Sequence, residues 1–253
     1  MTPSPWLTGI PTADPALRLF LFPHAGGAAS AYAHWLDRGG DALEIRSVQY
    51  PGREARLRER PLHSIGELAD GLARAIAAER PGPPCVFFGH SMGALVAFEV
   101  AKRLRDLGLS GPERLFAAAC AAPQTPRRTT LGTLTDDLLA AWLIREDPSC
   151  AEALAHPELA ALVLPALRAD LTAVETYRPT PGPPLDCPVT VLTGSDDTLH
   201  GVAVTGWRDH TTDEFRHHEF PGGHFFVRTS EREVMNLMED LMEDLMKGLT
   251  RDL

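Results

Sequence analysis

Short apolar runs alternate along this chain with longer segments in which apolar residues recur at helical spacing. The apolar runs predict β-strands at Leu17–Phe22, Leu43–Gln49, Cys85–Phe88, Arg114–Cys120, Val189–Thr193 and Glu214–Phe220. The segments between them predict helices at Tyr32–Leu36, Ile65–Ala78, Ala94–Leu107 and Val202–His210, and a long helix from Glu231. This repeated alternation predicts the α/β class, with a mostly parallel sheet flanked by helices on both faces. Ligands of such sheets bind beyond the carboxyl ends of the strands.

The alternation stops between residues 124 and 180. One amphipathic pattern there consists of Leu134, Leu138, Leu139, Trp142 and Leu143. A second begins at Pro157 and continues through Leu159, Leu162, Val163, Leu167, Leu171 and Val174. Pro165 is expected to kink that helix, because proline removes a backbone hydrogen bond. We predict that residues 124–180 form a helical lid inserted in a single domain of residues 1–253; the alternative is that these helices extend the core.

A repeat of four residues, Leu-Met followed by two acids, occupies Leu237–Met246. Four residues turn a helix by about 400°, so the Leu-Met stripe drifts about 40° around the helix per repeat. A stripe of this kind favours packing against the core of the same chain. The alternative is a contact with a partner or a second copy.

Charge and composition exclude some classes of function. The net charge of −10 argues against nucleic-acid binding, which needs a basic surface. The longest apolar runs are too short to cross a membrane, and Met1–Asp14 lacks the basic start of a secretory signal. Four cysteines, with no C-x-x-C spacing, include Cys85, Cys120 and Cys187 in or beside apolar runs, which predicts buried thiols. These features together favour a cytoplasmic protein.

The strongest chemical signal is the pattern G-x-S-x-G at Gly89–Gly93, between a predicted strand and a predicted helix. This is the arrangement of a nucleophile elbow, in which a serine sits on a very tight turn. Glycines two residues before and after Ser91 avoid a clash in that turn. The helix that follows favours negative charge at its start. We therefore predict Ser91 as a nucleophile; the alternative is a Gly-Ser turn without chemistry.

A serine nucleophile needs a base and an acid that orients the base, and with this elbow they follow in the order acid, then histidine. His224 comes after Pro221–Gly223, in a loop that directly follows the last predicted strand, and is the predicted base. The alternative is a loop histidine that caps the next helix. The acid is expected after Val189–Thr193, where Asp196 and Asp197 are both candidates. Spacing alone does not choose between them.

The anion formed during acyl transfer needs two backbone donors. One is the amide of Met92, directly after the serine. The other is expected in Pro23–Gly27, after the first central strand, where we choose the amide of Ala25; the alternative is a plain strand-to-helix turn. No spacing typical of a metal site and no Gly-rich nucleotide motif is present, so we predict neither a metal nor a cofactor.

Five segments in this order together resemble the type II thioesterases, the stand-alone editing enzymes of polyketide and nonribosomal peptide assembly lines. They are Phe22–Gly27, Gln49–Arg53, Phe88–Ala94, Gly194–Asp197 and Gly222–Phe226. The resemblance implies an α/β-hydrolase fold with a helical lid. It also implies hydrolysis of acyl groups from the phosphopantetheine arm of an acyl carrier protein or peptidyl carrier protein, without a cofactor.

Matched residue by residue, the resemblance makes Ser91 the nucleophile and His224 the base. It favours Asp197 as the acid, because the family has two variable residues between a glycine and the aspartate. Thr198 stands where the family usually has proline. A general acyl-CoA thioesterase or small-ester hydrolase of the same fold is the alternative function.

Arginines are dense at Arg53, Arg56, Arg58 and Arg60, with two glutamates between them. The ordinary interpretation of such a run is a solvated loop. The sharper prediction, on a chain that is otherwise acidic, is a docking site for an acidic carrier protein.

Overall fold

The computed structural model describes residues 4–79, 82–199 and 201–249. The first three residues of Met1–Asp14, the segment compared with a secretory signal, lie outside the described residues. So do both ends of the predicted domain of residues 1–253.

A seven-stranded sheet runs through the described part of the chain, in the order β1-β3-β2-β4-β5-β6-β7. Its strands are β1 (Leu7–Thr8), β2 (Leu17–Phe22), β3 (Leu43–Val48), β4 (Cys85–His90), β5 (Arg114–Ala118), β6 (Val189–Gly194) and β7 (Phe215–Phe220). Every neighbouring pair is parallel except β1 and β3. The six predicted strands are therefore confirmed. Strand β1 could not be predicted from the sequence, because two residues are too short to show a periodicity.

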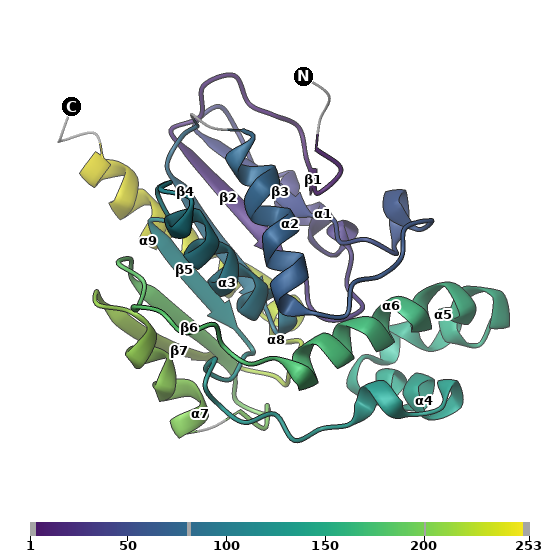
Figure 1. Ribbon diagram of the computed structural model, residues 1–253. Coiled ribbons are helices and arrows are strands. Elements are labelled where there is room, and N and C mark those ends of the chain that lie inside the picture. The colour runs from purple at the N-terminus through teal and green to yellow at the C-terminus, as the bar shows by residue number, and fades with distance from the viewer. Residues whose placement is uncertain (1–3, 80–81, 200, 250–253) are drawn as a thin grey trace.

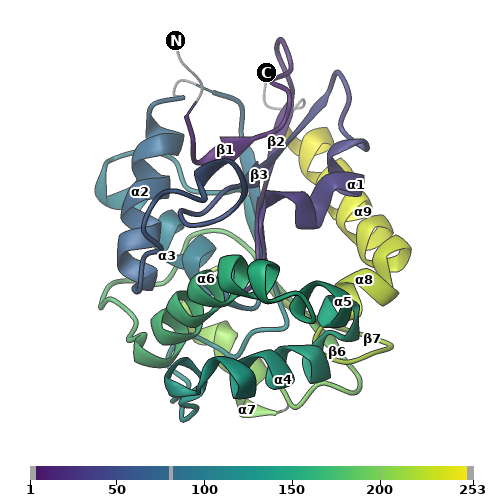
Figure 2. The same ribbon diagram turned by 90° about the vertical axis from the view of Figure 1, so that its right-hand side faces the viewer.

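Helices cover both faces of this sheet. The α-helices of the described residues are α1 (Ala33–Leu36), α2 (Ile65–Ala77), α3 (Met92–Asp106), α4 (Asp136–Glu146), α5 (Ala151–Leu154), α6 (Pro157–Thr176), α7 (Val202–Thr205), α8 (Phe226–Thr229) and α9 (Glu231–Leu249). Short 3₁₀ helices add η1 (Ala29–Tyr32), η2 (Glu54–Arg56), η3 (Leu131–Thr133), η4 (Pro148–Cys150) and η5 (Gly206–His210). Figure 2 shows α2 and α3 on one side of the sheet and α1 and α9 on the other. This is the mostly parallel, helix-flanked sheet that the alternation predicts.

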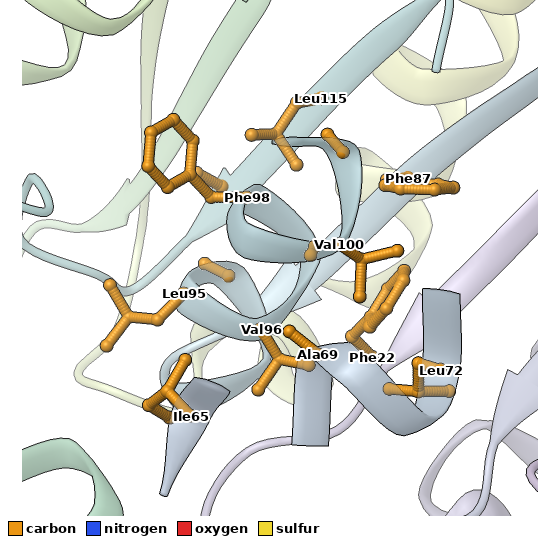
Figure 3. Packing of buried hydrophobic residues seen from close by; sticks show 14 of the residues in the cluster. Phe22, Ile65, Ala69, Leu72, Phe87, Leu95, Val96, Phe98, Val100 and Leu115 are labelled. Carbon is orange, nitrogen blue, oxygen red and sulfur yellow. The ribbon is translucent and has the colours of Figure 1, made fainter. Parts of the chain in front are cut away.

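The larger core lies between the sheet and the helices α2 and α3. Leu95, Val96 and Val100 of α3 pack there against Phe22 and Phe87 of the sheet (Figure 3). Each of these side chains is almost completely removed from water. Burying one of them fully is worth about 1.5–3 kcal/mol, so α3 is held firmly at its position on the sheet. The residue that precedes α3 is held with it.

The second core, on the other face, includes the stripe of α9. Val234, Met235, Met238 and Met242 are buried there together with Leu19 of β2. The prediction that the Leu-Met repeat packs against the core is therefore confirmed for its members Met238, Leu241 and Met242. Methionine suits such a stripe, because its flexible thioether fills the irregular gaps left by a drifting pattern.

The segment between β5 and β6 contains η3, α4, η4, α5 and α6 as an insertion. Figure 1 shows these helices beyond the carboxyl ends of the strands, on the side where α3 begins. They form an apolar cluster of their own, made of Leu139, Leu143, Leu164, Leu167 and Leu171. Helix α6 begins at Pro157 and continues through Pro165 to Thr176. The insertion is helical, and it lies over the edge of the sheet where ligands of this class bind.

Some boundaries differ from the predicted ones. Strand β4 extends through His90 and α3 begins at Met92, so only one residue separates them. The predicted helix Val202–His210 is divided into α7 and η5. Cys85, Cys120 and Cys187 are buried and form no disulfide bond with another described residue, as predicted. Over the described ranges, no helix has both the length and the apolar character that a membrane span requires.

Candidate active site

Ser91 is the single residue between β4 and α3, and its backbone is strained. Its φ of 54° and ψ of −116° lie outside the regions that L-residues ordinarily adopt. Its amide donates to the carbonyl of Ala118 at the end of β5, at 2.8 Å. The core packing of α3 and the pairing of β4 hold this conformation on both sides. Ser91 is partly buried, so part of its surface is open to solvent at this sharp turn.

The two glycines of the motif are required by the close approach of neighbouring backbone. A Cβ at Gly93 would lie 2.0 Å from the carbonyl oxygen of Phe22, and one at Gly89 would lie 2.4 Å from the carbonyl oxygen of Gly93. Both distances are far below a van der Waals contact. The pattern G-x-S-x-G is therefore needed by the backbone geometry of this turn.

His224 lies between Ser91 and Asp197. Its Nε2 is 3.0 Å from Ser91 Oγ, and its Nδ1 is 3.0 Å from Asp197 Oδ2. A carboxylate only accepts hydrogen bonds, so the proton of the neutral imidazole belongs on Nδ1. Nε2 then carries a lone pair that faces the serine hydroxyl. A histidine in this arrangement can take the proton of the hydroxyl.

The structure brings Asp197, and not Asp196, to the histidine. Asp197 is buried, whereas the exposed Asp196 accepts a hydrogen bond from Ser195 Oγ. Burial by itself raises the pKa of the Asp197 carboxyl. The hydrogen bond and charge of His224, together with the amides of Thr198 and Leu199, outweigh burial and hold that pKa below its ordinary value. Asp197 is therefore ionised at neutral pH.

The loops that carry Asp197 and His224 are joined by backbone contacts. The amides of Ser195 and Asp196 donate to the carbonyls of Phe220 and Gly222, at 2.8 and 2.9 Å. A Cβ at Gly194 would lie 2.2 Å from the Gly222 carbonyl oxygen, so glycine lets the two loops approach. The acid and the base are thus positioned relative to each other by the ends of β6 and β7.

The backbone amides predicted as anion donors lie on two neighbouring elements. Met92 is the first residue of α3, and Ala25 lies in the loop after β2, packed against the apolar cluster of the insertion. Among the hydrogen bonds between described residues, none has the amide of Met92 or Ala25 as its donor. In the same described ranges, no three His, Cys, Asp or Glu side chains gather as a metal site would need.

Two histidines beside the site were not assigned a role from the sequence. His90 Nε2 is 2.9 Å from the carbonyl oxygen of His224, and the ring of His24 packs against that of His90 with centroids 5.1 Å apart. Burial, reinforced by the charges of Arg228, His224 and Arg53, lowers the pKa of His24 to about 3. Burial also lowers the pKa of His90 well below its usual range. Both rings are therefore neutral at pH 7, beside His224.

This neutrality makes the fold sensitive to acid. Between pH 6.5 and about 3, the unfolded chain binds a proton at His24 that the folded chain does not, so stability falls as the pH falls below 6.5. The expected cost from His24 at pH 5 is about 2 kcal/mol. The unchanged chain should therefore lose about 2 kcal/mol more of its free energy of unfolding between pH 7 and pH 5 than the His24→Gln chain. Urea unfolding of both chains at the two pH values measures this difference.

The matched control is His34→Gln, which replaces an exposed histidine of α1. Its loss of stability between pH 7 and pH 5 should equal that of the unchanged chain. An equal loss in the His24→Gln chain would show that His24 does not resist protonation.

The arginine-rich segment differs from its prediction. Arg53 and Arg56 are buried, with 6% and 7% of their surface exposed. Arg53 pairs with Asp170 of α6, and Arg56 pairs with Glu59 while its guanidinium lies 4.1 Å from the ring centroid of Trp6. The prediction that these two receive an acidic partner is therefore wrong, because both charges are used inside the protein. Arg58 and Arg60 are exposed, and for them docking stays a prediction.

Asp170, the partner of Arg53 beside the site, was not predicted from the sequence. It lies seven residues after Val163 and four before Val174, on the apolar side of the α6 pattern. A carboxylate at such a position must be paired when it is buried. An aspartate within the apolar pattern of a helix is therefore the sequence feature that indicates a buried ion pair here. The pattern does not say which arginine pairs with it.

Comparisons with known proteins identify the family of this chain. A model of the thioesterase domain family matches residues 17–244. The chain belongs to the thioesterase family. This places it among the enzymes that hydrolyse thioesters, and its fold is that of the α/β-hydrolases.

This thioesterase resembles thioesterases of several biosynthetic pathways. It is 43% identical over 229 residues to a probable cadicidin biosynthesis thioesterase of Streptomyces griseus, covering 89% of this chain and 62% of that protein. The solved structure of BorB, a type II thioesterase of the borrelidin biosynthetic cluster, superposes with a TM-score of 0.83 at 36% identity, over 93% of this chain and 95% of that one. YbtT, a type II thioesterase of the yersiniabactin NRPS/PKS pathway, gives 0.80 at 32% identity, over 92% and 96%.

Proposed function

We propose that this thioesterase removes acyl groups from the phosphopantetheine arm of an acyl carrier or peptidyl carrier protein, as an editing enzyme of a polyketide or nonribosomal peptide pathway. The observation that carries the proposal is the simultaneous approach of His224 to Ser91 and Asp197, each at 3.0 Å. The type II thioesterases BorB and YbtT support the choice of pathway.

The first half of the proposed reaction forms an acyl-serine. His224 Nε2 accepts the proton of Ser91 Oγ as the oxygen attacks the thioester carbonyl carbon. Asp197 stabilises the resulting imidazolium through its hydrogen bond to Nδ1. The negative charge that develops on the carbonyl oxygen is stabilised by the amides of Met92 and Ala25. The intermediate then collapses, the carbon–sulfur bond breaks, and the thiolate of the pantetheine arm leaves.

The second half releases the acid. A thiolate is a good leaving group, and as the carbon–sulfur bond breaks it takes the Nε2 proton from the imidazolium of His224 and departs as a thiol. The imidazole of His224 is then neutral again. A water molecule then gives a proton to His224 and attacks the acyl-serine carbonyl, with the same two amides stabilising the anion. Ser91 regains its proton from the imidazolium as the carboxylic acid departs. The cycle ends with every group in its initial state.

The inserted helices are proposed as the lid of this site. Their apolar cluster packs against Ala25, which links them to the loop of a proposed anion donor. A lid that excludes water around the thioester strengthens the electrostatic stabilisation of the transition state. The chain of residues 1–253 is then one α/β-hydrolase domain with residues 124–180 as its lid.

The carrier preference is tested by comparing one acyl group on three donors: a carrier protein, coenzyme A and free pantetheine. We expect kcat/KM to be at least about tenfold higher for the acyl-carrier than for either small donor. Contacts between the proteins need to contribute only about 1.4 kcal/mol for this difference. Release of free acid is measured for each donor.

The same assay tests the exposed arginines. Replacing both Arg58 and Arg60 by glutamate should lower kcat/KM for the acyl-carrier and leave hydrolysis of acyl-pantetheine unchanged, because the pantetheine has no acidic surface.

Equal kcat/KM of the wild-type chain on all three donors would instead indicate a general acyl-CoA thioesterase or small-ester hydrolase.

A further inference from the structure

The loop of the proposed anion donor Ala25 is held by side chains rather than by regular secondary structure. The Gln49 side chain accepts a hydrogen bond from the amide of Ala29, at 3.3 Å, and Arg53 Nη1 donates to the carbonyl of Gly27, at 3.0 Å. The amide of Gly26 donates to Asp170 Oδ2, at 2.8 Å. The residue directly after Ala25 is thus fixed by a carboxylate that belongs to α6.

Arg53 and Asp170 form the centre of this arrangement. Arg53 Nη1 and Nη2 donate to the two oxygens of Asp170, at 2.6 and 2.9 Å, and the Asp170 side chain is completely buried. A bidentate arginine–carboxylate pair has a narrow geometry. Because the same carboxylate oxygen also accepts from Gly26, a small displacement of Asp170 or Arg53 displaces the loop.

Leu167, one turn before Asp170 on α6, reinforces the contact. A Cβ at Gly26 would lie 3.0 Å from Leu167 Cδ1, and Gly26 has a φ of 77°, which few other residues adopt. The loop therefore touches α6 through both an apolar and a charged contact. The position of α6 and the position of the Ala25 amide are parts of one rigid arrangement.

We propose that Arg53 and Asp170 are positioning residues for catalysis, which set the Ala25 amide at the distance from the developing anion that acyl transfer requires. The inference rests on the proposed function, since it assumes that the Ala25 amide stabilises the anion. In this proposal, residues Gln49–Arg53 hold the loop that contains Ala25 and join it to α6. Neither Arg53 nor Asp170 touches the substrate.

The test compares two buried carboxylates. Asp170→Asn keeps the size of the side chain and an acceptor oxygen, but it removes the charge that holds Arg53. Glu44→Gln makes the same change at a completely buried glutamate that pairs with Arg18 and Arg46. Glu44 lies near the start of β3, at the end of the sheet opposite to the site. The two variants therefore disturb comparable ion pairs, one beside the proposed anion site and one remote from it.

We expect Asp170→Asn to lower kcat by about 10- to 100-fold on a small acyl-pantetheine thioester while KM changes little, because the anion contact is made only in the transition state. Its affinity for a boronic acid that forms a tetrahedral adduct with Ser91 should fall by a similar factor. Glu44→Gln should lose stability in urea but keep kcat and boronate affinity close to wild type. Equal loss of kcat in both variants, in proportion to their stability, would overturn the proposal.

Arg53→Lys is the second variant, and it serves if Asp170→Asn does not fold. Lysine keeps the positive charge but cannot donate to both oxygens of Asp170 and to Gly27 in the fixed geometry of the guanidinium. We expect a fall in kcat and in boronate affinity of about 5- to 20-fold. Wild-type kinetics in the Arg53→Lys chain would also overturn the proposal.

The small thioester keeps this result separate from the question of the carrier. A wild-type chain that cleaves the small thioester without preferring a carrier contradicts only the carrier part of the proposed function. A chain that cleaves no thioester contradicts the proposed reaction, and the positioning role fails with it.

Discussion

Replacing Ser91 with alanine is expected to abolish hydrolysis of an acyl-carrier thioester, with a fall in kcat on the order of 10⁴-fold or more. The oxygen that forms the acyl-enzyme is lost, and water is left to attack the thioester directly. Some acceleration should remain, because the amides of Met92 and Ala25 and the binding surface stay in place. The strained backbone is held by α3 and β4 and does not depend on the hydroxyl, so the variant should fold.

The matched control is Ser195→Ala, which removes an exposed serine two residues before Asp197 that bonds to Asp196 and not to His224. Free acid is measured by chromatography, and labelling by a fluorophosphonate reports the nucleophile directly. We expect the wild-type chain and Ser195→Ala to be labelled, and Ser91→Ala to stay unlabelled. Turnover by Ser91→Ala at the wild-type rate would remove the basis for an acyl-serine intermediate.

Asp197→Asn is expected to lower kcat on the order of 10³- to 10⁴-fold. The asparagine keeps the shape of the side chain, but its amide group donates where the carboxylate only accepts. The imidazole of His224 is then stabilised in the wrong tautomer, with its proton on the nitrogen that faces Ser91. The imidazolium formed during attack also loses its counter-charge.

Asp196→Asn is the control for this prediction, because Asp196 is the neighbouring residue, has the same chemistry and is exposed to solvent. It should hydrolyse the thioester at close to the wild-type rate. The measurement is kcat on one acyl-carrier for both variants, with circular dichroism to establish that each is folded. If Asp196→Asn lost more activity than Asp197→Asn, the acid would have to be reassigned.

The features that could be predicted from the sequence are those determined by neighbouring residues. The elbow at Ser91 needs a strand, two glycines and a helix, and all of them lie within a few residues of the serine. His224 could be predicted because a loop that follows a strand of a parallel sheet lies at the same edge as the elbow. The choice between Asp196 and Asp197 could not be made from spacing, because it depends on which side chain turns toward the histidine.

The features that could not be predicted depend on contacts between distant parts of the chain. Arg53 and Asp170 are 117 residues apart, and nothing local shows that they meet. A run of arginines is usually solvated, so the burial of Arg53 and Arg56 contradicts the ordinary expectation for charge. The positions of these side chains are decided by where the insertion lies on the sheet, which is a property of the whole fold.

The methionines of α9 give this fold a particular response to oxidants. Met235, Met238 and Met242 form part of the apolar layer beneath the sheet and are at most 2% exposed. Conversion of a buried thioether to a sulfoxide places a polar oxygen inside this apolar layer, where the oxygen loses its contact with water. A peroxide reaches these sulfurs only when α9 opens, so their rate of oxidation measures how often the last helix leaves the sheet.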